Sequence, residues 1–212
     1  MDAVETEVLL QRVGIKDAVE WGRGRTLNEI WHASPSGKLL LKLALEAGVE
    51  RRRVLGALCA CVRLTLKYTQ VEGPQYEPLD TPCVPIALEL AEAWARGAPG
   101  VELDAVRAMS VEAHDAASLV DCMESYGRTP YPPGAVHATF AVAFLLDAVG
   151  VEDVGECSNH LGNSFSYAEV ATAAQHGHSE ESRREFRETC ARVVRDFIRA
   201  EDVAMAVATS RR

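Results

Sequence analysis

The adjacent pair His114-Asp115 is the part of this sequence whose residue types come closest to a catalytic centre. An imidazole nitrogen and carboxylate oxygens are common ligands of a catalytic divalent metal, which activates a water molecule for hydrolysis. The remaining ligands must then come from other segments of the chain.

This pair resembles part of the metal-binding set of the helical HD-domain phosphohydrolases, which use an isolated histidine, an adjacent His-Asp pair and a later aspartate. The resemblance implies a metal-dependent hydrolase in which His32 and Asp147 complete the set. The separation between His32 and the pair is long for such a set, and the segment around His114 lacks the expected flanking apolar pattern. His114, Ser118 and Asp121 instead form a polar stripe on a predicted helix over 102–126, which is typical of a solvated or partner-binding face. We expect no catalytic residue, metal or cofactor here, and we take His114, Asp115 and Asp121 as candidate partner contacts.

A second group of polar residues lies between glycines in the segment 151–165, which we expect to be a loop. Cys157, His160 and Asn163 are the residue types of a thiol hydrolase, but the groups of such a site normally converge from distant parts of a fold. The segment is therefore either an ordinary connector or a binding loop. Asn159 and His160 are its candidate partner contacts.

The sequence of the helix predicted over 82–96 contains signals for its start, its end and its two faces. Proline is tolerated in a first helical turn, and Gly97 ends the helix. Glu89, Glu92 and Arg96 share one face, where Glu92 and Arg96 have the spacing of an ion pair, and both glutamates are candidate partner contacts. The opposite face carries the predicted buried stripe, which consists of Cys83, Ile86, Leu90 and Trp94.

Glycine and proline divide the chain into about eight apolar-periodic segments, and none shows the alternation of a strand. We therefore predict an all-α protein, one domain over 1–212 with a possible N-terminal subregion 1–70. The helix over 134–149 is apolar nearly all round and is expected at the centre of the bundle. Stiff, proline-containing connections are expected over 71–80 and 127–134. The predicted helices are 3–13, 26–33, 36–47, 50–70, 82–96, 102–126, 134–149 and 166–207, the last broken near Gly177.

The composition limits the classes of partner and the compartment. With 31 acidic and 22 basic residues the formal net charge is -9, which disfavours nucleic acid and anionic membranes and favours basic proteins. The six cysteines form no CxxC pair, so we expect reduced thiols. The acidic N-terminal segment is unlike a secretion signal, and the apolar runs are too short to cross a bilayer. A cytoplasmic location is expected.

Three blocks of the chain carry a resemblance to a known family. The blocks are Thr26-Leu-Asn-Glu-Ile-Trp31 with Lys38-Leu-Leu-Leu-Lys-Leu-Ala44 and Gly48, then Pro85-Ile-Ala with Ala93-Trp-Ala-Arg-Gly97, and finally Cys190-Ala-Arg-Val-Val-Arg195. Together they resemble a family of bacterial, all-helical immunity proteins encoded among polymorphic toxin systems. The middle of the chain departs from the alanine-rich middle of that family. The resemblance implies a non-enzymatic helical protein that neutralises a cognate toxin by binding it, and it transfers no site residue.

Taken together, the sequence favours a binding protein, and an immunity protein whose basic toxin meets an acidic surface is the leading hypothesis. A helical adaptor that self-associates into a homo-oligomer is the main alternative. The metal-dependent phosphohydrolase built on His114 and Asp115 is the enzymatic one.

Overall fold

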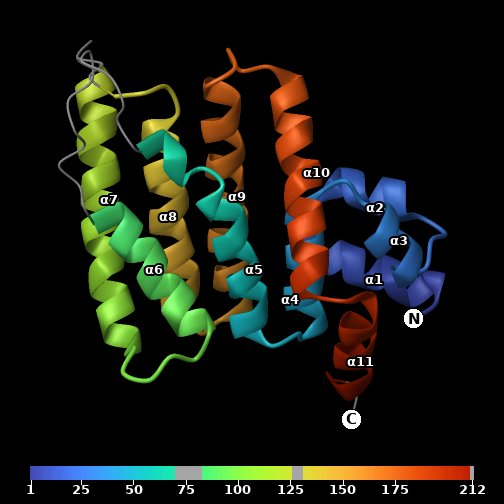
Figure 1. Ribbon diagram of the computed structural model, residues 1–212. Helices are drawn as coiled ribbons and strands as arrows, with labels where there is room; N and C mark the ends of the chain where they lie inside the picture. The colour runs from blue at the N-terminus through green and yellow to red at the C-terminus, as the bar shows by residue number, and fades with distance from the viewer. Residues whose placement is uncertain (70–82, 126–130, 211–212) are drawn as a thin grey trace.

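The computed structural model describes residues 1–69, 83–125 and 131–210. Over these ranges the chain forms eleven α-helices and one short 3-10 helix, and no β-strand (Figure 1). The predicted all-α class is confirmed, although the helices outnumber the eight that were expected. The connection predicted over 71–80 and most of the one over 127–134 lie outside the described residues.

The observed helices follow the predicted segments closely in the first two thirds of the chain, with one short helix added. The segment predicted as one helix over 50–70 ends earlier as an α-helix and continues as a 3-10 turn. The elements are α1 (Ala3–Val13), α2 (Lys16–Gly22), α3 (Leu27–Ala33), α4 (Gly37–Ala47), α5 (Arg51–Arg63), η1 (Leu66–Thr69), α6 (Cys83–Ala95), α7 (Leu103–Ser125), α8 (Ala135–Gly150), α9 (Val154–Ala174), α10 (Glu180–Phe197) and α11 (Ala200–Ser210).

Local hydrogen bonds explain where several of these helices begin. The N–H and hydroxyl of Thr26 both donate to the carboxylate of Glu29, whose own N–H is capped by the threonine oxygen. This capping box begins α3 and holds the pKa of Glu29 below its usual value. Ser36 accepts from the N–H of Leu39 in the same way and begins α4.

The segment predicted as a loop over 151–165 is the first half of α9, so that prediction is wrong. Asp153 starts the helix by accepting a hydrogen bond from the N–H of Glu156 at 2.8 Å. The glycines and asparagines that suggested a loop stay helical because α9 packs against its neighbours along its whole length. At Gly162 the absence of a side chain makes room for Lys42, since an added Cβ would lie 3.0 Å from its Cε.

The end of the chain contains two helix breaks rather than one. The break near Gly177 is confirmed, and Ser179 begins α10 by accepting from the N–H of Ser182. A second break falls between Phe197 and Ala200, where α10 ends and α11 starts in a new direction (Figure 1).

The helices are arranged so that α7, α8 and α9 lie side by side, with α5 and α6 packed across them (Figure 1). Helices α4 and α10 pack beside α5 and α9, and α1, α2, α3 and α11 lie at the far end of the molecule from α7. Helix α8 is buried on most sides between α7 and α9. Its remaining half-exposed positions include His137, Phe140, Phe144 and Asp147.

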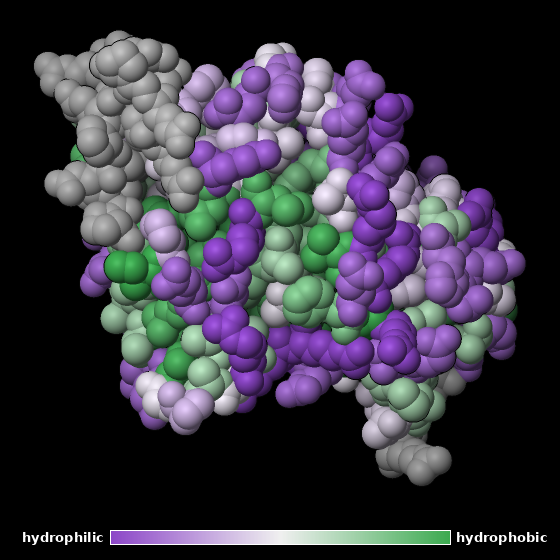
Figure 2. Space-filling model, in the orientation of Figure 1, coloured by the Kyte–Doolittle hydropathy of each residue, from purple (hydrophilic) through white to green (hydrophobic). Residues whose placement is uncertain are grey.

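The buried face of α6 differs from the predicted stripe. Ile86 is 51% exposed, and Trp94 is only half-buried under the guanidinium groups of Arg51 and Arg52. Because α6 is apolar on nearly every side, the positions of α5, α7 and α8 decide which residues are covered. Figure 2 shows apolar side chains at the surface over the α5–α6 face, between hydrophilic ones. The buried residues of α6 are Val84, Ala87, Leu88 and Ala91.

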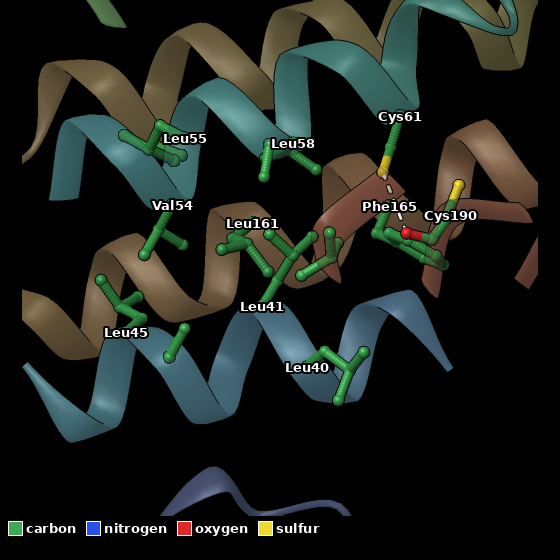
Figure 3. Packing of buried hydrophobic residues seen from close by; sticks show 14 of the residues in the cluster. Leu40, Leu41, Leu45, Val54, Leu55, Leu58, Cys61, Leu161, Phe165 and Cys190 are labelled. Carbon is green, nitrogen blue, oxygen red and sulfur yellow. Dashed lines mark hydrogen bonds between the residues drawn. The ribbon is translucent and has the colours of Figure 1, made fainter. Parts of the chain in front are cut away.

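One continuous hydrophobic cluster extends from α1 to α11. At its middle, Leu41 of α4, Leu58 of α5 and Leu161 of α9 point toward one another, next to Phe165 (Figure 3). All of these side chains are fully buried, and burial of this kind contributes about 1.5–3 kcal/mol for each large apolar side chain. This cluster fixes the relative positions of α4, α5 and α9.

None of the six cysteines forms a disulfide bond, and four of them are buried. Burial raises the pKa of the Cys59 and Cys157 thiols, which disfavours their reactive thiolate form. No helix in the described part of the chain combines the length and apolar character needed to cross a membrane.

Candidate functional site

A carboxylate on α8 joins polar side chains from three helices. Asp147 accepts hydrogen bonds from Nε2 of His114 at 2.8 Å and from the hydroxyl of Ser110, both on α7. On the other side, Nδ1 of His160 on α9 lies 3.5 Å from the same carboxylate. Each of the two histidines and the aspartate is partly exposed. We refer to Ser110, His114, Asp147 and His160 as the Asp147 cluster.

Aromatic rings continue this cluster along the half-exposed face of α8. Phe140 and Phe144 stack on Tyr167 of α9 with ring centroids 5.1 and 5.3 Å apart. The His114 ring meets Phe144 edge-on at 5.1 Å, and the His160 ring stacks on Phe144 at 6.1 Å. The His114 ring is therefore held by an aromatic contact as well as by the carboxylate. Nδ1 of His160 is buried without a hydrogen bond, so the aromatic contact orients that ring.

The geometry of the Asp147 cluster does not provide a nucleophile with an adjacent base. Ser110 and His114 bind different oxygens of Asp147, so the hydroxyl is not paired with the imidazole that would have to deprotonate it. The contacts orient side chains and link helices. Cys157 is buried and donates to the carbonyl of Ala148, so it is not part of a thiol site with His160.

The ligand set that the metal-dependent alternative requires is not assembled. His32 lies on α3, at the opposite end of the molecule from α7 (Figure 1). Asp115 is exposed and lies outside the Asp147 cluster. Across residues 1–69, 83–125 and 131–210, no three His, Cys, Asp or Glu side chains are grouped to hold a metal ion.

The outer face of α7 combines negative charge with exposed apolar side chains. Val111 and Leu119 are 63% and 56% exposed, and Asp115 lies between them at helical spacing, so the three form one line along the helix. Glu112 and Asp121 are also exposed. Arg107 is the basic residue of this helix, and it is paired with Asp104 at 3.0 Å. We call Val111, Glu112, Asp115 and Leu119 the α7 face.

The structure brings some of the predicted partner contacts together and separates others. His114 and His160 meet at Asp147, and Asn159 is exposed beside His160 on α9. Asp115 and Asp121 are exposed on α7. All five lie on the α7–α8–α9 layer, although they come from two predicted segments. The second segment contributes from a helix and not from the expected loop.

Glu89 and Glu92 lie on α6, close to Arg63 of α5. Glu92 is engaged within the protein, because Nε and Nη2 of Arg63 donate to its two oxygens at 2.5 and 2.7 Å. Arg96 lies farther away, 3.7 Å from Glu92, at the spacing predicted for an ion pair. The carboxylate raises the pKa of Arg63 through these hydrogen bonds, and Glu89 adds to the effect through its charge.

Sequence reasoning missed the aromatic half of this arrangement. The residues His137, Phe140, Phe144 and Asp147 follow one another at spacings of three and four, which is the period of one helix face. That spacing was available from the sequence, but the surrounding apolar residues made the helix look uniformly buried. Ser110 carries no comparable signal.

The protein is thus all-helical, and the Asp147 cluster and its neighbouring aromatic rings form a half-exposed site on the α7–α8–α9 layer. Comparison with protein-family models, with curated proteins and with solved structures finds nothing that matches this chain.

Proposed function

We propose that this chain is a non-enzymatic, cytoplasmic binding protein that neutralises a basic toxin protein by direct contact through the α7 face. The observation that carries the proposal is the line of Val111, Asp115 and Leu119, in which two exposed apolar side chains flank a carboxylate. Protein interfaces commonly place apolar anchors among charged groups, and the charges direct the choice of partner.

The charge of the surrounding surface supports a basic partner. Asp104, Glu112, Asp115 and Asp121 are exposed on α7 against the one basic residue, Arg107, and the whole chain has a net charge of -9. A field of this sign speeds encounters with a positively charged protein. The resemblance to immunity proteins points to the same class of activity.

The Asp147 cluster contributes by fixing α7 in place. Its hydrogen bonds tie α7 to α8, and His160 of α9 adjoins the same carboxylate. A binding surface that is rigid before contact loses less conformational entropy on association. The cluster is therefore assigned a positioning role.

The experiment is co-expression with the toxins encoded beside this gene, followed by measurement of growth and of binding by the purified proteins. Reversal of two charges in the variant Glu112→Lys/Asp115→Lys is expected to weaken binding about tenfold or more, chiefly through slower association. Leu119→Asp is expected to lose protection by removing an apolar anchor.

The matched control is Asp17→Lys/Glu20→Lys, which makes the same change in net charge at exposed positions of α2. It is expected to protect as well as the unmodified chain. Failure to bind or protect against any neighbouring toxin contradicts the proposed function. Equal loss in both double variants assigns the effect to net charge and removes the α7 face as the binding surface.

A self-associating adaptor is the second candidate, and one observation favours it. Val4 and Val8 of α1 are 74% and 47% exposed, and Met205 of α11 is 61% exposed. A groove of about 290 Å³ lies between α1 and α11 and includes Val4, Val8 and Val207. This alternative predicts a stable oligomer in light scattering that Val4→Asp/Val8→Asp dissociates, and a monomeric chain rules it out.

A further inference from the structure

A groove of about 520 Å³ lies between α5, α6 and the end of α10, on a face that the α7 proposal does not use. Its floor is made by small or apolar residues, Gly56, Ala60 and Ala95, together with Phe197, which is 40% exposed. Its rim carries three arginines, Arg52, Arg53 and Arg96, and two glutamates, Glu50 and Glu92. Figure 2 shows this face as an apolar strip between hydrophilic side chains.

The arginines of the rim outnumber its carboxylates although the chain as a whole is acidic. Arg53 is already used within the protein, because it pairs with Asp202 at 2.7 Å and donates to the carbonyl of Phe197. Glu92 is likewise used, because Arg63 donates to both of its oxygens. These pairs leave two arginines and Glu50 as the remaining charges of the rim.

Arg52 and Arg96 are those remaining arginines. Arg52 forms no ion pair with a carboxylate in the described ranges, and its guanidinium lies 5.2 Å from the centroid of the Trp94 ring. Arg96 is 67% exposed and has only the long, 3.7 Å contact with Glu92. Both guanidinium groups therefore keep donors for an anion from outside the protein.

The position of Arg52 is set by its neighbours. It shares the Trp94 ring with Arg51, which is itself held by the carbonyls of Ala148 and Val149. Gly97 lies directly against it, because an added Cβ there would be 2.9 Å from Nη1 of Arg52. Gly97 also has a φ of 68°, which glycine adopts without strain. The Arg52 guanidinium thus lies close to both Trp94 and Gly97.

We propose that this groove binds an acidic peptide segment of a partner protein, with carboxylates on Arg52 and Arg96 and an apolar side chain against Phe197. Arginine suits this role because its planar group donates two parallel hydrogen bonds to a carboxylate. A small inorganic anion would use the rim and leave the apolar floor exposed. A peptide uses both, and the charge of the rim selects an acidic one.

The first test is selection of a random peptide display library on the purified chain, followed by anisotropy measurements with the enriched peptides. We expect enriched sequences that combine Asp or Glu with a large apolar residue. The variant Arg52→Gln/Arg96→Gln is expected to bind them about tenfold or more weakly, with affinity falling as salt rises. Glutamine keeps most of the side-chain length, and circular dichroism checks that the variant is folded.

The control variant is Arg12→Gln/Arg23→Gln, which removes two exposed arginines from the α1–α2 end of the chain, and it is expected to bind the peptides unchanged. The proposal is overturned if no acidic sequences are enriched, or if both double variants bind equally well. It is also overturned if Ser in place of the apolar peptide residue changes nothing while inorganic phosphate displaces the peptide, since the site then recognises anions only. None of these outcomes bears on the α7 face, which is tested with a basic partner.

Discussion

The carboxylate of Asp147 on α8 lies 2.8 Å from Nε2 of His114 on α7, at a position where both side chains are partly buried. The hydroxyl of Ser110 binds the other carboxylate oxygen. Partly buried polar groups are stable only while they keep their hydrogen-bond partners. This pair therefore adds a polar link between α7 and α8 to the packing of their buried apolar side chains.

Replacing Asp147 with alanine is expected to destabilise the protein by about 1–3 kcal/mol, because His114 and Ser110 both lose their acceptor. The measurement is the free energy of unfolding from urea titration, followed by circular dichroism. The control is Asp104→Ala on α7, where the side chain is 91% exposed and the expected change is below about 0.5 kcal/mol. Equal changes in the two variants would contradict a linking role for Asp147.

Alanine substitutions at Gly134 and Gly24 distinguish the cost of backbone strain from the cost of a steric clash. Both have a positive φ, 88° and 75°, so alanine at either position costs about 1–2 kcal/mol in strain. At Gly134 an added Cβ would also lie 2.4 Å from the carbonyl oxygen of Ala171, whereas at Gly24 no atom lies within 4 Å. We expect Gly134→Ala to lose about 2–5 kcal/mol in all. Thermal unfolding of both variants measures the difference, and similar melting temperatures would refute the close approach of α8 to α9.

His137 makes the stability depend on pH in a predictable direction. Burial lowers the pKa of His137 below its usual value of 6.5, and the charges of His178 and Arg183 lower it further while Asp121 opposes them. The unfolded chain therefore takes up the proton at a higher pH than the folded chain does. The contribution of His137 to the free energy of unfolding is therefore fully present above pH 6.5 and is lost as the pH drops below that value.

The variant His137→Gln tests this dependence. Its free energy of unfolding is expected to fall less than that of the unmodified chain between about pH 8 and about pH 5. Urea titrations at the two pH values provide the measurement. A loss of the same size in both proteins would show that His137 does not contribute.

Most helix ends followed from local sequence signals. The Thr26–Glu29 capping box, Ser36 and Gly97 act through hydrogen bonds within a few residues, so their effect is visible in the sequence. Local sequence signals gave the wrong prediction for 151–165, where glycine and asparagine suggested a loop. There the packing of α9 against α4 and α8 outweighs the weak helix preference of Gly155 and Gly162.

Which faces are buried was harder to predict than which segments are helical. The sequence placed Ile86 and Trp94 in the core, whereas the structure buries Ala87 and Ala91 of the same helix. In a helix that is apolar on most sides the periodic pattern no longer distinguishes one face from another. The neighbouring helices that cover α6 then determine which of its residues are buried.

The sequence by itself determined the all-helical class, the acidic charge and most helix ends, because these depend on composition and on contacts within a few residues. Only the tertiary structure decided that His114, Asp147 and His160 meet, and that Glu92 pairs with Arg63. These residues are separated by many positions in the chain, and one sequence contains no signal for their distance in space. Their grouping results from the packing of α7, α8 and α9, and of α5 with α6.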